Sequence, residues 1–113
     1  MKEIKAIIKS HRLESVLELL HEHPDLPGVT ISHVQGFGHM VGRKDSETGE
    51  PVHFGMANLV KLECVVDDEM VEEILQVISD AARTGRRGDG KVFIHHIDEV
   101  MNIRDGSRSD HIQ

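Results

Sequence analysis

The sequence predicts an α+β protein with a ferredoxin-like sandwich, whose elements follow one another in the order βαββαβ. Three observations predict it: the length of 113 residues suits one compact domain, two segments space their apolar residues as helices do, and short runs of β-branched residues flank both. In this fold the strands form one antiparallel sheet with both helices on one face. We expect a single domain spanning residues 1–113.

The first half of the chain predicts a strand, a helix and a second strand. Residues 3–9 form a β-branched run, and residues 12–22 place leucine and valine at helical spacing. Pro24 cannot continue the helical hydrogen bonding, so the helix should end just before it. A strand is then predicted over residues 28–35.

Residues 36–58 interrupt the pattern with five glycines, a proline and a polar centre. No apolar period is sustained there, so we expect a long exposed loop over about residues 38–58. Loops of this length in a compact domain usually carry function.

The second half repeats the order of the first. Residues 59–66 alternate in polarity as a strand does, and a helical stripe follows, capped by Asp67 or Asp68. Residues 91–97 predict the last long strand. The tail, about residues 106–113, is expected to be frayed.

Two helices cover only one face of such a sheet. Apolar residues on the other face would stay in contact with water unless a second subunit buries them. We therefore expect self-association.

Composition and charge exclude several classes of protein. The formal net charge of −7 should repel nucleic acid, so no nucleic-acid partner is expected. Without an apolar run of eighteen residues or a signal-peptide core, we expect neither a membrane span nor secretion. The single cysteine, Cys64, rules out an intrachain disulfide and favours a reducing compartment, so we expect a cytoplasmic protein.

The sharpest local motif is TGRRGDGK at residues 84–91. Glycines let backbone N–H groups converge on an anion, and the basic side chains add positive charge, so phosphate is the expected ligand. A plain glycine-rich turn is the equally weighted alternative. The motif is not a Walker A loop, because Val92 follows it where serine or threonine should stand.

Metal binding and catalysis find less support in the residues. Among nine histidines, only His39 and His53, which flank the loop, could meet over one ion if the loop folds back. No nucleophile elbow, zinc-protease helix or paired cysteine is present, so we expect no enzyme. Cys64 is read as a core residue.

Four segments together resemble the PII signal-transduction proteins, the nitrogen-regulatory family. They are MKEIKAIIKSHRLESVLELL, VQGFG before the long loop, LVKLECVVDDEMVEEIL and ARTGRRGDGKVFIHHIDEVMNIRDG. The similarity spans nearly the whole chain. The signature TG-x-x-GDGK, followed by a strand and IR-x-G, is more specific than a glycine-rich turn alone.

The resemblance implies a homotrimer that binds ATP or ADP in clefts between subunits and signals through the long loop to a protein partner, which could be a membrane transporter. It implies a sensor and not an enzyme. The resemblance places Gly88, Asp89, Gly90, Lys91 and Arg104 at the phosphates of the nucleotide. It places Gly36, Phe37 and Gly38 at the loop base, and Ile7, Thr30, Glu63 and Val65 around the adenine. Arg104 would come from the same or a neighbouring subunit.

Departures from the family pattern bear on ligand choice. Met40 replaces a glutamine that helps bind Mg²⁺ and 2-oxoglutarate, and Leu59 replaces a lysine that grips 2-oxoglutarate. We expect no 2-oxoglutarate sensing, and the role of Mg²⁺ stays open. Val52 stands where some members carry a uridylylated tyrosine, and Asn102 replaces an arginine, which favours ADP or AMP over ATP.

Two functions from different classes follow. The first is a divergent PII-like regulator that responds to adenine nucleotide. The alternative is a metal-binding trimer of similar architecture linked to heavy-metal tolerance, which would use His39 and His53.

Overall fold

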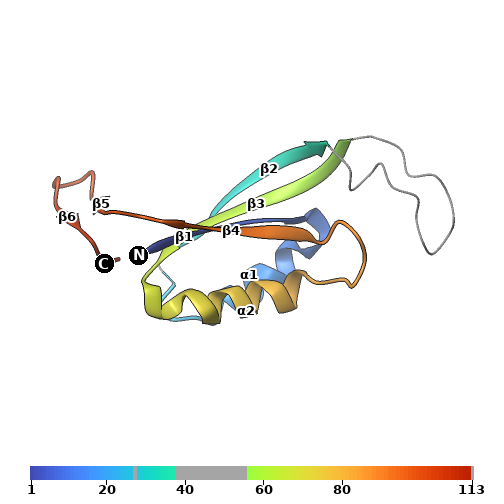
Figure 1. Cartoon of the computed structure of the whole chain (residues 1–113), viewed down its shortest axis with the longest axis horizontal. Coiled ribbons are helices and arrows are strands. Elements are labelled where there is room, and N and C mark those ends of the chain that lie inside the picture. Colours follow the sequence, from blue (N-terminus) through green and yellow to red (C-terminus); the bar gives the residue numbers. More distant parts are fainter. Residues whose placement is uncertain (27, 38–55, 113) are drawn as a thin grey trace, which may run out of the picture.

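The computed structural model describes residues 1–26, 28–37 and 56–112. It has one four-stranded antiparallel sheet in the order β2-β3-β1-β4, and both long helices lie against one face of it (Figure 1). The strands are β1 (Lys2–Lys9), β2 (Thr30–Phe37), β3 (Met56–Val66) and β4 (Gly90–His96). The helices are α1 (Leu13–His21) and α2 (Val71–Ala82). The predicted ferredoxin-like fold is confirmed.

The core lies between the sheet and the two helices. Alternate residues of β1 and β3 point toward the helices, where Ile4, Ala6 and Val60 are almost completely buried. The helices contribute the apolar stripe that their spacing predicts, including Val16, Leu20, Ile74 and Ile78. Burial of these side chains on one face explains why the helices form where they do.

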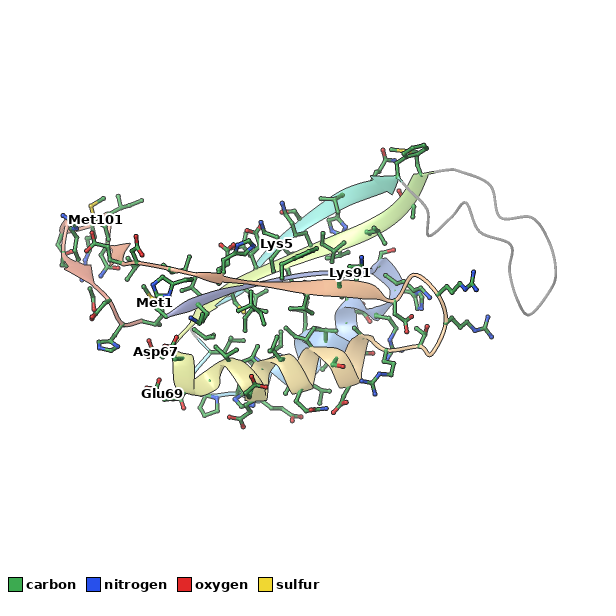
Figure 2. The ribbon with its side chains drawn as sticks, in the orientation of Figure 1. Met1, Lys5, Asp67, Glu69, Lys91 and Met101 are labelled. Atoms are coloured by element: carbon green, nitrogen blue, oxygen red, sulfur yellow. The ribbon has the colours of Figure 1, made fainter. Side chains whose placement is uncertain are left out.

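The opposite face of the sheet is more polar than expected. It carries Glu3 and Lys5, whose charged groups lie 4.0 Å apart, and Lys61 and Glu63, separated by 3.6 Å. Lys5 projects from this face, away from the helices (Figure 2). The far face is therefore polar at its centre, where ion pairs occupy the middle of β1 and β3.

The predicted start of the loop, at about residue 38, agrees with the end of β2, but its predicted end at residue 58 is wrong. β2 continues to Phe37 and β3 begins at Met56, with Phe37 opposite Met56 and Gly36 opposite Ala57. Ladder pairing therefore extends through Met56, Ala57 and Asn58, which the sequence assigned to the loop. Cross-strand pairing compensates for the lack of an apolar period there.

The tail is not frayed. Two short strands, β5 (Val100–Met101) and β6 (Arg108–Ser109), form a hairpin beyond β4. The Asn102 N–H donates to Ser107 O at 2.8 Å, and Gly106 takes a left-handed φ of 73°. Farther on, the Ile112 N–H donates to the Asp67 carboxylate at 3.0 Å.

The two acidic residues before α2 do not cap it. A 3₁₀ turn (Asp68–Met70) precedes the helix, and neither carboxylate bonds to the helix N-terminus. Asp67 accepts from Ile112, and Asp68 accepts from the Met1 amine at 2.8 Å. That bond lowers the pKa of Asp68. The capping prediction is wrong because these carboxylates bind groups that are distant in sequence.

No helix among the described residues is long and apolar enough to cross a membrane.

Candidate functional site: a turn folded around an internal carboxylate

The turn between α2 and β4 is organised by one side chain, Asp89. Its carboxylate accepts hydrogen bonds from the backbone N–H groups of Thr84 and Gly85, both at 2.9 Å, and from the Thr84 hydroxyl. The Arg86 N–H in turn donates to Thr84 Oγ1 at 3.2 Å. The N–H groups of Thr84 and Gly85 therefore converge on an anion as predicted, but the anion is the chain's own carboxylate.

Lys9 joins this turn to the sheet. Its ammonium lies 3.1 Å from Asp89 Oδ1 and 3.2 Å from Thr84 Oγ1. The side chain of Lys9 also passes close to Gly88, as a Cβ on that glycine would meet Lys9 Cε at 3.8 Å. Sequence reasoning missed Lys9, and its only signal is its place at the end of the strand that pairs with β4.

These contacts set the charge state of Asp89. Partial burial alone would raise the pKa of the carboxyl, but hydrogen bonds from Thr84, Lys9 and Gly85 outweigh it and hold the pKa well below its usual range. Asp89 is therefore ionised at neutral pH, and its negative charge faces the Lys9 ammonium.

Two of the glycines in the motif serve the fold of the turn. Gly90 has a left-handed φ of 117°, and a Cβ there would overlap the carbonyl oxygen of Ile7 on β1. Gly88 also has a positive φ, of 80°. The close backbone approach predicted for a ligand is made at Gly90 by β1 itself.

Three cationic side chains of the turn remain at the surface. Arg86, Arg87 and Lys91 are all exposed, and Lys91 lies opposite Ile7 in the β1–β4 ladder. The end of the sheet at Lys91 (Figure 2) is thus positively charged around the neutralised pair of Lys9 and Asp89.

The residues that the resemblance places around adenine share one sheet face. Thr30 pairs with Glu63, Val65 pairs with Glu3, and Ile7 pairs with Lys91 and Lys61. Directly paired residues project from the same face, and this register places all of them on the face away from the helices. The structure therefore brings Ile7, Thr30, Glu63, Val65 and Lys91 to a common face.

The loop base lies at the ends of β2 and β3. Phe37 is 69% exposed, and the Leu59 side chain lies over Gly36, where a Cβ would come within 2.7 Å of Leu59 Cδ1. An apolar, buried Leu59 thus occupies the position where the family has a lysine. Gly38 lies outside the described residues.

The two halves of the candidate site lie at opposite edges of the sheet. The loop base belongs to β2 and the turn to β4, and β3 and β1 stand between them. Three inter-strand spacings separate the two edge strands by about 14 Å. One chain therefore does not bring Gly36 and Phe37 together with residues 88–91.

Arg104 lies still farther away. It is exposed at the tip of the β5–β6 hairpin, at the opposite end of the molecule from the turn (Figure 1). Figure 2 shows the same separation between Met101 and Lys91. Within one chain, Arg104 and the turn therefore do not come together.

The alternative metal site has no supporting observation in the described part of the chain. No group of three or more histidine, cysteine, aspartate or glutamate side chains is placed to hold an ion there. His39 and His53 both lie outside the described residues. Cys64 is buried, and burial together with the nearby Glu3 charge raises its thiol pKa to about 11. It is a core residue, as predicted.

Comparison with known proteins identifies the family. The family model described as "Nitrogen regulatory protein P-II" matches residues 1–107. The nitrogen regulatory protein P-II of Rhodospirillum rubrum is 42% identical over 108 residues, which cover 96% of each chain. That of Azospirillum brasilense is 40% identical over the same shares of both chains. Nitrogen regulatory protein P-II 2 of Methanothermobacter thermautotrophicus is 41% identical, over 94% of this chain and 91% of its own. With this fold, this turn and these relatives, the chain belongs to the nitrogen regulatory protein P-II family.

Proposed function

We propose that this regulator binds an adenine nucleotide, which could be ATP, ADP or AMP, between the subunits of a cytoplasmic homotrimer. The phosphates lie at residues 88–91, and the adenine lies on the sheet face beside Ile7, Glu63 and Val65. The bound nucleotide sets the state of the segment that joins β2 to β3, and a protein partner such as a membrane transporter reads that state.

The observation that carries the proposal is the turn at residues 84–90. It is folded around its own Asp89 carboxylate, and it leaves Arg86 and Lys91 at the surface beside the sheet face of Ile7. A preordered turn with surface cations suits phosphate, since little conformational entropy remains to be lost on binding.

Assembly follows from the separation of the parts. Arg104 lies at the far end of the chain from the turn, so a site that uses both needs more than one copy. A cyclic trimer brings one edge of each chain to another edge of its neighbour.

Leu59 and the absence of tyrosine limit the ligands and modifications to which the chain can respond. A buried isobutyl group cannot pair with a carboxylate, so we propose that 2-oxoglutarate is not sensed. The chain has no tyrosine to accept a uridylyl group.

Isothermal calorimetry tests the proposal. ATP, ADP and AMP are titrated with and without Mg²⁺ and 2-oxoglutarate, into wild type and the Lys91→Ala and Arg104→Ala variants. We expect micromolar binding that is indifferent to 2-oxoglutarate and weakened about tenfold or more by either substitution. Lys2→Ala, at the other end of β1, is the matched control. Equal affinity in all four proteins would reject the site assignment, and no binding to wild type would reject the function.

A further inference from the structure

Asp89 presents an electrostatic problem for a phosphate site. The carboxylate lies inside the turn between Gly88 and Gly90, in the segment proposed to hold phosphate. An uncompensated negative charge there would repel a nucleotide, most strongly one that carries three phosphates. The turn nevertheless needs the carboxylate, because Asp89 accepts the N–H groups of Thr84 and Gly85.

Lys9 is placed to solve this problem. Its ammonium lies 3.1 Å from Asp89, and the two side chains are only 22% and 25% exposed. Other lysines of the sheet pair elsewhere and are less shielded: Lys5 and Lys61 are both 31% exposed and lie beside Glu3 and Glu63. The Lys9–Asp89 pair is also closer than these two pairs, which lie at 4.0 and 3.6 Å, so its Coulomb attraction is stronger.

We propose that Lys9 is a positioning residue of the nucleotide site. It neutralises Asp89 and holds it against the turn, so that an incoming phosphate meets the surface cations without opposition from the internal carboxylate. Lys9 acts through Asp89 and does not itself bind phosphate, because its ammonium is already engaged with Asp89 and the Thr84 hydroxyl. This inference rests on the proposed nucleotide function.

Paired substitutions separate this role from two others. Lys9→Met leaves Asp89 uncompensated, whereas Lys9→Met combined with Asp89→Asn removes both charges, and the asparagine oxygen can still accept from Thr84. If Lys9 neutralises Asp89, the second substitution recovers binding that the first one lost. If Lys9 binds phosphate directly or only stabilises the fold, Asp89→Asn recovers nothing.

The experiment is calorimetry with ATP and AMP on each protein, with melting temperatures recorded in parallel. We expect Lys9→Met to raise the ATP dissociation constant about tenfold and the AMP constant about threefold, since AMP carries less charge. The double variant should return to within about threefold of wild type for ATP. The Lys9→Arg variant should bind ATP almost as tightly as wild type does. It provides a second measurement if Lys9→Met folds poorly.

Lys2→Met, on the same strand but remote from the turn, is the control and should bind as wild type does. A Lys9→Met affinity within twofold of wild type, or a double variant as weak as Lys9→Met, overturns the inference alone. Absence of nucleotide binding by wild type refutes the proposed function, and the role of Lys9 with it.

Discussion

Gly90 joins the turn to β4 at a point where its backbone lies against the backbone of Ile7 on β1. Its φ of 117° disfavours any L side chain, and a Cβ would overlap the Ile7 carbonyl oxygen, which belongs to a central strand and cannot easily move. We expect Gly90→Ala to lower the free energy of unfolding by about 2 kcal/mol or more, measured by denaturant titration. Gly106→Ala is the control, because Gly106 also has a positive φ but faces open space, and about 1 kcal/mol is expected there. Equal losses would contradict the overlap with Ile7.

Asp89 should couple stability to pH. Its pKa in the folded protein lies below the value of about 3.9 in an unfolded chain, so its ionised form stabilises the fold. That contribution is fully present above about pH 5 and is lost as the pH falls toward the folded-state pKa. We expect Asp89→Asn to be less stable by about 1 kcal/mol at pH 7 and to lose less stability than wild type between pH 5 and pH 3. Thermal melts of both proteins between pH 5 and pH 3 measure this difference. If the stability of wild type and of Asp89→Asn fell equally with pH, the depressed pKa of Asp89 would make no contribution.

At the scale of elements, Arg12 fastens the end of α2 to the start of α1. Its Nε and Nη2 donate to the Ala81 carbonyl oxygen at 3.0 and 2.6 Å, so they satisfy an acceptor that a helix C-terminus leaves open. We expect Arg12→Met to cost about 1–2 kcal/mol in chemical denaturation. Arg83→Met is the control: at the exposed end of α2 its guanidinium lies 3.9 Å from Asp80 and donates to Ser79 Oγ at 2.7 Å, and a change within about 0.5 kcal/mol is expected. A larger effect at Arg83 than at Arg12 would contradict this account.

The long elements were predictable because their information is local. α2 and residues 60–66 of β3 each carry an apolar period of their own type, and the buried residues follow it. The β5–β6 hairpin carries no such period. Asn102 and Ser107 hold it through backbone and side-chain hydrogen bonds, and Glu99 pairs with Arg108. Polar pairing of this kind leaves no hydropathy signal, so the sequence indicated a frayed tail.

The same distinction applies to the candidate site. The glycines and cations of residues 84–91 are contiguous, and they predicted an anion-binding turn. Lys9 lies 75 residues from Thr84 in sequence, and only the pairing of β1 with β4 brings them together. The sequence could not show that Asp89 occupies the turn's own N–H groups, because an aspartate in a glycine-rich turn looks the same whether it faces inward or outward.

For the whole molecule, charge is divided between the helical layer and the turn. Residues 13–25 and 67–82 hold ten of the twenty acidic side chains and no lysine or arginine. Arg86, Arg87 and Lys91 lie instead at the end of the sheet where the turn is. Among the described residues, the end of the sheet at the turn is therefore more favourable to an anion than the helical layer, although the net charge of the chain is −7.

Mixed assemblies test whether the turn and Arg104 meet across a subunit boundary. Lys91→Ala and Arg104→Ala chains are refolded together, so that some boundaries combine an intact Lys91 from one chain with an intact Arg104 from another. Random mixing should restore wild-type ATP affinity at about one quarter of the sites. Calorimetry measures the fraction, and the two variants combined without refolding are the control. A mixture with no high-affinity sites would mean that Lys91 and Arg104 reach each site from the same subunit.

If the nucleotide site lies between copies of the chain, its occupancy also depends on how much of the protein is assembled. A ligand held between different copies of the chain is bound only by assembled protein. Its apparent affinity would therefore depend on the concentration of the chain. For the proposed site, linkage would make the effect reciprocal: each bound nucleotide would strengthen the association of the copies that hold it, and dilution would release both together. With Arg104 and the turn at opposite ends of one chain, the proposed site would make nucleotide sensing and assembly a single equilibrium.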